Sequence, residues 1–223
     1  MRIAVCVRQG LDGELNPFDA SAYEIALSEA GAEVILISMG VPKTADLLQH
    51  LTRLGASRAV LQSDPIFAGS DTLATAYVLS CAMEKLKPDR ILCGRKTLIG
   101  DTGQVPPMLA EMAGYEFLPD VLTVADGNAV TREGNRNIPP RALLAAEKQA
   151  VLRLPSLLSR VGTVETWNAA DIGADPMRCG LNGSPTRVLE TRENTAGRRK
   201  CRILQLRDLP EIFAEALRER RER

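Results

Sequence analysis

One segment of the sequence combines glycines with charged and hydroxyl side chains. It spans residues 93–104, follows a short apolar run and leads into a helical pattern that starts at Gly103. Gly94, Gly100 and Gly103 let a ligand approach the backbone closely, and N–H groups at the start of a helix favour an anion such as phosphate. The pattern slightly favours a nucleotide site over the other interpretation, an ordinary capped turn between a strand and a helix.

Charged side chains in the same segment add to this interpretation. Arg95 and Lys96 supply positive charge, which pairs well with phosphate oxygens. Asp101 supplies an acceptor and Thr102 a hydroxyl, suited either to a helix cap or to a ribose. The segment matches neither the P-loop pattern nor the glycine pattern of dinucleotide-binding folds, so its spacing alone does not identify a ligand.

Other candidate residues are weaker. Ser38, Met39 and Gly40 follow an apolar run, where an ordinary turn is the simpler explanation, and residues 16–19 (NPFD) have the proline and aspartate of a helix start. The single histidine, His50, lies within a helical pattern, so no Ser-His-Asp or Cys-His catalytic set can be assembled. Paired carboxylates and metal-ligand spacings do not stand out either. This weakens any hydrolase interpretation, and we expect no catalytic residue and no metal site.

Composition excludes several classes of protein. The 223 residues include 28 basic and 28 acidic side chains, so no overall field favours nucleic acid or a membrane surface. Arginine is enriched only in residues 198–202 and 218–223, where a solvated or partner-docking segment is favoured over an RNA-binding one. The five cysteines are widely spaced and odd in number, which indicates a reducing compartment. With no signal region and no apolar run of about 20 residues, we expect a cytoplasmic protein that does not insert into membranes.

The first half of the chain alternates between apolar runs and helical patterns. Helices between strands require crossover connections, which predicts a doubly wound α/β fold with a mostly parallel sheet covered on both faces. Such sheets bind ligands beyond the carboxyl ends of their strands, so the loops after Val7, Ile37 and Cys93 should form the site. The predicted strands are residues 3–7, 33–37, 58–61 and 90–93, and the predicted helices are residues 19–29, 43–54, 70–86 and 103–112.

The second half predicts a different arrangement, with strands joined by turns and then an irregular region. The strands should extend the sheet or form an antiparallel addition to it. We therefore predict a nucleotide-binding domain over residues 1–180, followed by a C-terminal arm and helix over residues 181–223 for partner contact. The predicted strands are residues 121–125, 129–133, 142–147 and 151–160, the irregular region is residues 168–182, and the amphipathic helix is residues 208–221.

Several longer stretches resemble the beta subunits of electron-transfer flavoproteins. Residues 67–77 (FAGSDTLATAY) and 93–107 (CGRKTLIGDTGQVPP) are the most specific of these, and the matches are ordered along nearly the whole chain. The resemblance implies a Rossmann-like fold of the adenine nucleotide alpha hydrolase type. The other matching stretches are RIAVCVRQ (2–9), NPFDASAYEIAL (16–27), VILISMG (34–40), LTRLGASRAVLQSD (51–64), DRIL (89–92), MLAEMAG (108–114) and GLNGSPTRV (180–188).

The resemblance also implies cofactors and a partner. In that family the beta subunit binds AMP, or a second FAD in the electron-bifurcating members, and pairs with an alpha subunit that carries the redox-active FAD. Phe18 matches an aromatic that lies near the alpha-subunit flavin. The residues that the resemblance assigns to nucleotide binding are Cys6, Val7, Asn16, Met39, Gly40, Gly94, Arg95, Gly100, Asp101, Thr102, Gly103, Gln104 and Val105.

Three departures from the family pattern indicate a shortened, divergent member. Only residues 9–15 stand where the family usually has a longer stretch with a β-hairpin, so part of the surface over the flavin is absent. Ile99 replaces an aspartate before the GDT motif, which removes one polar contact. The NEPRYxxLxxI-like segment that docks on partner dehydrogenases is missing between residues 158 and 167.

Three functions are therefore to be compared. The first is an electron-transfer subunit that holds AMP or FAD and pairs with an alpha-type chain, or otherwise forms homo-oligomers. The second is an adenine-nucleotide-binding regulatory or assembly module without redox function, which the three departures favour. The third, an enzyme that hydrolyses ATP or transfers adenylyl groups, needs a phosphate loop or metal carboxylates that the sequence lacks.

Overall fold

The computed structural model describes residues 1–10, 12–98, 100–186 and 210. The chain divides into two compact units, Met1–Arg187 and Val188–Arg223. The helices and strands whose bounds are given below all belong to the first unit. The predicted amphipathic helix at residues 208–221 lies outside the described residues, apart from Pro210.

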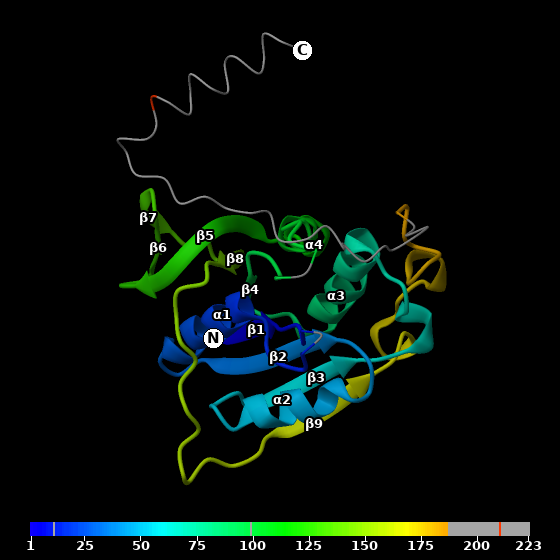
Figure 1. Ribbon diagram of the computed structural model, residues 1–223, viewed down its shortest axis with the longest axis horizontal. Helices are drawn as coiled ribbons and strands as arrows, with labels where there is room; N and C mark the ends of the chain where they lie inside the picture. The colour runs from blue at the N-terminus through cyan, green and yellow to red at the C-terminus, as the bar shows by residue number, and fades with distance from the viewer. Residues whose placement is uncertain (11, 99, 187–209, 211–223) are drawn as a thin grey trace. The chain divides into compact units, whose positions relative to one another are not determined.

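The first unit is built on one nine-stranded sheet with the strand order β7-β6-β5-β8-β4-β1-β2-β3-β9 (Figure 1). Strands from β5 through β8, β4, β1, β2 and β3 to β9 are parallel, whereas β5, β6 and β7 form an antiparallel meander. The bounds are β1 Arg2–Cys6, β2 Glu33–Met39, β3 Arg58–Gln62, β4 Arg90–Gly94, β5 Glu116–Ala125, β6 Asn128–Thr131, β7 Gly134–Asn137, β8 Ala142–Ala146 and β9 Thr163–Trp167.

Two pairs of helices cover opposite faces of this sheet. Helices α1 (Pro17–Ser28) and α2 (Thr44–Thr52) pack on one face, and α3 (Thr72–Leu86) and α4 (Val105–Ala113) pack on the other. Because successive strand residues point to opposite faces, Ile3 and Val5 of β1 contact the first pair while Ala4 and Cys6 contact the second. The predicted doubly wound α/β fold is confirmed.

The second half adds strands to both edges of the sheet. β8 inserts parallel to and between β4 and β5, and β9 pairs with β3 at the far edge. Strand β5 begins at Glu116, before the predicted residue 121, and its register shifts between Leu118 and Val121, where Asp120 has a φ of 57°. Strand β7 was not predicted because its four residues, GNRN, are all exposed and carry no apolar alternation.

The prediction of a strand over residues 151–160 is wrong. The segment between β8 and β9 is irregular, and Leu154, Leu157 and Leu158 are almost fully exposed. Its backbone is held by α1 instead of by a strand, since the N–H of Ala150 donates to Ser21 Oγ and that of Arg153 donates to Glu24. An apolar run was read as buried, and Pro155 lacks an N–H for a sheet ladder.

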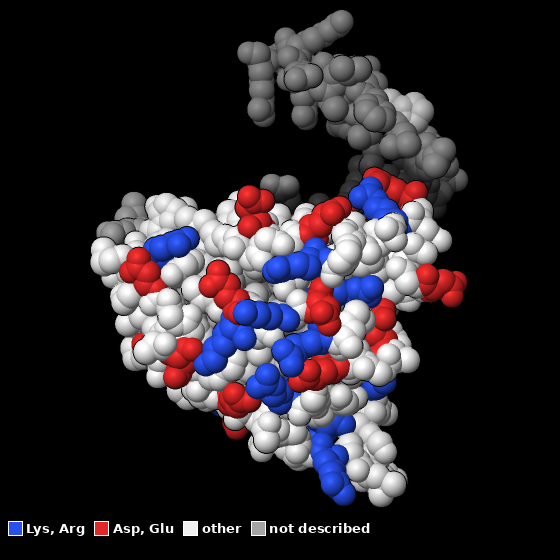
Figure 2. Space-filling view, turned by 180° about the vertical axis from the view of Figure 1, so that it is seen from behind, with Lys and Arg blue, Asp and Glu red and all other residues white. Residues whose placement is uncertain are grey.

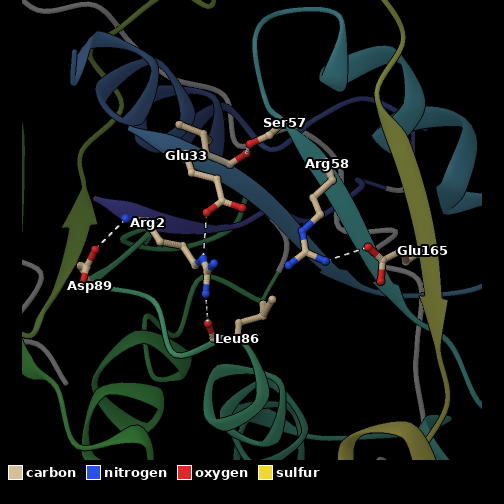
Figure 3. A network of polar contacts seen from close by, with 8 residues as sticks. Arg2, Glu33, Ser57, Arg58, Leu86, Asp89 and Glu165 are labelled. Atoms are coloured by element: carbon tan, nitrogen blue, oxygen red, sulfur yellow. Dashed lines mark hydrogen bonds and ion pairs between the residues drawn. The ribbon is translucent and has the colours of Figure 1, made fainter. Parts of the chain in front are cut away.

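Charged residues at the amino ends of the strands are used to join neighbouring strands (Figure 3). Arg2 at the start of β1 contacts Glu33 of β2 at 2.9 Å and donates to the carbonyl of Leu86, while Arg58 of β3 contacts Glu165 of β9 at 2.7 Å. These partly exposed pairs each contribute modestly to stability. They fasten the end of the sheet that lies opposite the carboxyl ends of the strands.

The surface shows no face of a single charge in the view of Figure 2. Lysine and arginine side chains alternate there with aspartate and glutamate, which agrees with 28 basic and 28 acidic residues in the whole chain. Within the part of the chain that the structure describes, every helix is too short or too polar to cross a membrane.

Candidate functional site

A pocket of about 380 Å³ opens at the carboxyl ends of β1, β2 and β4. β1 is the point where the strand order reverses, because β2 and β3 follow it on one side and β4, β8 and β5 lie on the other. Open α/β sheets bind ligands at such a switch point, since the loops that leave the two strands diverge there. The location of the pocket therefore agrees with the loops named from the sequence.

The strand ends supply the floor of this pocket. Cys6 at the end of β1, Val7 directly after it, Met39 of β2 and Gly94 of β4 line it, and the resemblance assigned all four to nucleotide binding. The N–H of Val7 donates to the carbonyl of Ile37 at 2.8 Å, so the chain continues along β2 before it turns away. Four predicted residues from three separate strands are thus brought together.

The loop between β4 and α4 forms one wall. Gly100, Thr102, Gly103, Gln104 and Val105, which the resemblance also assigned to nucleotide binding, line the pocket. Gly100 and Gly103 have φ values of 91° and 61°, which glycine adopts without strain. The helix start is a poorer source of N–H donors than the sequence suggested, because the second and third helical residues are prolines.

The start of α3 also lines the pocket, and the sequence analysis did not include it in the site. Ser70, Asp71, Thr72 and Thr75 line the pocket there. Asp71 caps the helix by accepting N–H bonds from Leu73 and Ala74 at 2.9 and 3.1 Å. The signal was present in the motif at residues 67–77, but only the loops after β1, β2 and β4 were considered as ligand sites.

The C-terminal end of the first unit is fastened to the start of α3. The backbone N–H and the hydroxyl of Thr186 donate to Asp71 Oδ2, and the N–H of Asp71 donates to Ser184 Oγ. Desolvation is the largest single influence on Asp71 and raises its pKa, but the hydrogen bonds from Thr186, Ala74 and Leu73 together outweigh it and hold the pKa below its ordinary value. Residues that the sequence analysis assigned to the arm therefore contact the rim of the pocket.

Some predicted residues do not line this pocket. The N–H of Gly40 donates to the carbonyl of Gln62, and a Cβ at Gly40 would lie 2.7 Å from Thr44 Oγ1, so this glycine serves the turn into α2. Arg95 contacts Glu147 at 2.8 Å and Asp120 at 3.5 Å. Its side chain is thus held beside β8 and β5.

Asp101 also lies outside the lining of the pocket. It has a φ of 47° and contacts Lys96 Nζ at 2.7 Å, and Lys96 itself lines the pocket. This ion pair closes the loop between β4 and α4 on itself. A direct contact of Asp101 with a nucleotide stays a prediction.

Asn16 and Phe18 are buried beside the pocket. Asn16 Nδ2 donates to the carbonyl of Lys96 at 3.0 Å, and Asn16 lines a second, smaller pocket of about 280 Å³. Phe18 is 6% exposed, with Lys96 Nζ 5.7 Å from its ring centroid. The short stretch before them still forms a small hairpin, since Gln9 pairs with Leu15 and the N–H of Gly10 donates to the carbonyl of Glu14.

Asp19 is a pocket residue that the sequence analysis explained only as part of a helix start. Its side chain lines the pocket and is nearly buried, at 5% exposure. It accepts N–H bonds from Arg8 at 2.8 Å and from Gly94 at 2.9 Å. Burial raises the pKa of Asp19 to about 7, although these hydrogen bonds act in the opposite direction.

Two thiols lie next to this carboxyl group. Cys6 and Cys93 are partners in the register of β1 and β4, and both line the pocket. Burial, and then the charge of Asp19, raise the pKa of Cys6 to about 12; burial likewise raises the pKa of Cys93 well above its ordinary value. Neither thiol is activated as a nucleophile.

The described lining of the pocket offers groups that can bind a ligand. His50 is exposed on α2 and lines neither pocket. Across the described ranges, no three histidine, cysteine or acidic side chains are grouped so that they could hold a metal ion. The pocket instead combines an apolar side, formed by Ile37, Met39 and Leu79, with hydroxyls at the starts of two helices.

Comparison with known proteins agrees with this geometry. Residues 3–138 match the family model described as the electron transfer flavoprotein domain. The chain is 36% identical over 198 residues to the electron transfer flavoprotein subunit beta of Clostridium acetobutylicum, covering 82% of this chain and 76% of that protein. It is 35% identical over 210 residues to Protein FixA of Azorhizobium caulinodans, covering 82% and 74%.

A third relative is named as part of a larger assembly. It is the caffeyl-CoA reductase-Etf complex subunit CarD of Acetobacterium woodii, which is 34% identical over 209 residues, covering 83% of this chain and 78% of that protein. The family model, over residues 3–138, includes the ends of β1, β2 and β4 at the pocket. The chain belongs to the electron-transfer flavoprotein family, as a member of its beta-subunit branch.

Proposed function

We propose that this chain is an electron-transfer flavoprotein beta-type subunit that holds AMP or FAD in the pocket at the switch point. The observation that carries the proposal is the convergence of predicted residues from β1, β2 and β4 with the starts of α3 and α4 around one cavity of about 380 Å³. A planar base fits the apolar side, and hydroxyls and backbone N–H groups suit a ribose and phosphate. The cytoplasm is the compartment that we propose for it.

The phosphate has identifiable partners in the described residues. Thr75 and Thr102 carry hydroxyls and line the pocket, and the positive ends of the α3 and α4 dipoles are directed toward it. Lys96 is partly neutralised by Asp101, so fixed dipoles contribute more to anion binding than a free lysine does. AMP and the adenylate half of FAD present the same base, ribose and phosphate to this pocket.

The proposal includes an alpha-type partner. FAD bound in that partner would supply the redox chemistry, while this chain would orient the partner and hold the structural nucleotide. Membership of the family supports such a pair, and the name of CarD describes a subunit of a complex. Without the partner, we expect the chain to self-associate.

Binding and pairing can be tested separately. Isothermal titration of nucleotide-free protein with AMP, ADP, ATP and FAD should give heat with AMP or with FAD. The absence of heat with all four ligands would remove the nucleotide part of the proposal. Light scattering of the chain with and without a co-expressed alpha-type subunit from the same organism should show a heterodimer when that subunit is present. The heterodimer should be yellow because it carries flavin. A colourless monomer that does not bind that subunit would contradict the part of the proposal that concerns the partner.

A second candidate is an adenine-nucleotide-binding regulatory or assembly module. The small size of the hairpin at Gln9–Leu15 favours it, because less surface remains to cover a partner's flavin. The two candidates differ in one measurement. In the reconstituted complex, a beta-type subunit permits the flavin to be reduced and reoxidised by redox proteins, whereas a regulatory module leaves the flavin inert.

A further inference from the structure

Asp19 occupies an unusual position for a carboxylate. It lies in the first turn of α1, where an acidic side chain is common, but it turns inward and is only 5% exposed. Burying a carboxylate costs free energy unless hydrogen bonds replace its water. Two backbone N–H groups supply such bonds, one on each carboxylate oxygen, and the side chain of Asn16 contributes a further hydrogen bond.

These two N–H groups belong to the two strands that separate at the switch point. Arg8 follows the end of β1 and donates to Oδ2, and Gly94 is the last residue of β4 and donates to Oδ1. β1 and β4 are neighbours in the sheet up to Cys6 and Cys93, after which their chains diverge around the pocket. The carboxylate therefore joins the chains where the sheet no longer does.

The sequence at Gly94 is adapted to this contact. A Cβ at Gly94 would clash with Asp19 Oδ1 and would lie 2.6 Å from the Cβ of Phe18. Gly94 does not have a positive φ, so its need for glycine comes from the close approach of α1 and not from backbone conformation. The contact between β4 and α1 therefore requires both Gly94 and Asp19.

We propose that Asp19 is a positioning residue of the nucleotide pocket, whose ionised carboxylate holds the ends of β1 and β4 in the arrangement that binds an adenine nucleotide. This inference rests on the proposed nucleotide site. Protonation converts one carboxylate oxygen into a hydroxyl, which accepts poorly, so that one of the two N–H groups loses its partner. Affinity for the nucleotide should therefore depend on the charge of Asp19.

Burial raises the pKa of Asp19, so its carboxyl group changes protonation state near neutral pH. Cys6 on β1 and Cys93 on β4 are neutral thiols at that pH because burial raises their pKa. The Arg8 side chain acts electrostatically to lower the pKa of Asp19, and Lys96, which lines the same pocket, is paired with Asp101. With a pKa of about 7, Asp19 is then the group of this cluster that titrates between about pH 6 and pH 8.

The first test compares AMP affinity in the intact chain and in Asp19→Asn at several pH values. Asparagine keeps one acceptor and presents an amide N–H to the other donor. At about pH 8 the variant should bind AMP roughly tenfold more weakly, and near pH 6 the ratio should approach one. The ionisation of the AMP phosphate affects both proteins equally at a given pH, so it cancels in the ratio of their affinities. Asp46→Asn, an exposed aspartate in the first turn of α2, is the matched control and should show no change.

A ratio that stays constant between these pH values, or that equals one throughout, would overturn the proposal. A second measurement needs no variant, which covers the case in which Asp19→Asn does not fold. In the intact chain, the amide resonances of Arg8 and Gly94 should titrate together near pH 7. The amide of Leu73, which donates to Asp71, should not move in this range because hydrogen bonds lower the pKa of Asp71.

Resonances of Arg8 and Gly94 that stay fixed would also overturn the proposal. This readout does not involve a nucleotide, so it distinguishes the two proposals. Co-titration of the amides in a protein that binds no AMP or FAD would leave the carboxylate contact intact and contradict the nucleotide site. Nucleotide binding without any titration would contradict the positioning role alone.

Discussion

The hydroxyl of Thr72 donates a hydrogen bond of 3.0 Å to Oε1 of Gln104. This bond joins the first residue of α3 to the residue that precedes α4, so the starts of the two helices adjoin and line one pocket. Since Oε1 accepts from Thr72, the orientation of the Gln104 side-chain amide is set. The contact makes Gln104 the predicted site residue with the best-defined geometry.

We expect Asp101→Ala combined with Gln104→Ala to weaken AMP binding by roughly 1–3 kcal/mol, the usual cost of removing polar contacts. Because Gln104 lines the pocket and Asp101 does not, Gln104→Ala alone should produce most of this loss. Titration calorimetry of both single variants and the double variant measures it. Gln49→Ala, on the exposed face of α2, is the control. A larger loss from Asp101→Ala than from Gln104→Ala would contradict this geometry.

The thiols of Cys6 and Cys93 should report on ligand binding. Burial keeps both thiols protonated, so alkylation of the folded chain near pH 8 should be slow, and saturating AMP should slow it further. Cys81 and Cys179 are buried outside the pocket and should show no such protection. Mass spectrometry of each cysteine peptide gives the rates. Equal protection of all four cysteines would indicate general stabilisation instead of occupancy of this pocket.

Gly94→Ala should destabilise the fold and disturb the pocket together. The added Cβ would force α1 away from the end of β4, at a cost of about 1–3 kcal/mol. Gly127→Ala is a useful comparison, because its Cβ would meet open space and only its φ of 75° opposes the change. Urea denaturation should show the larger loss for Gly94→Ala. The opposite order would mean that α1 adjusts to the added methyl group easily.

The contribution of Asp19 to the free energy of unfolding should fall as the pH rises from about 4 to about 7. Its folded pKa of about 7 exceeds its ordinary value of 3.8, so between these values the folded chain binds more protons than the unfolded chain. The slope reaches at most about 1.4 kcal/mol per pH unit. The difference in unfolding free energy between the intact chain and Asp19→Asn, measured in urea at several pH values, isolates this contribution. Parallel curves for the two proteins would show that burial does not shift the pKa of Asp19.

The sequence alone determined the layers of the fold and the end of the sheet that carries the site. Apolar runs such as residues 33–37, alternating with helical patterns, leave a parallel doubly wound sheet as the arrangement that buries them. The carboxyl ends of β1, β2 and β4 followed from that, with Met39 and Gly94 at two of them. These conclusions depend on local patterns and on general rules of chain connection.

Tertiary structure decided which neighbouring residues reach the pocket. Gln104 and Asp101 are three residues apart. The packing of α3 against α4 brings Gln104 into hydrogen-bond contact with Thr72, whereas Asp101 pairs with Lys96. Thr72 enters the site for the same reason. Asp19 looked like an ordinary helix-start residue, and its burial follows from the close approach of α1 to Gly94. Exposure of Leu154, Leu157 and Leu158 likewise could not be read from an apolar run, since hydrophobicity does not state which side chains the rest of the chain covers.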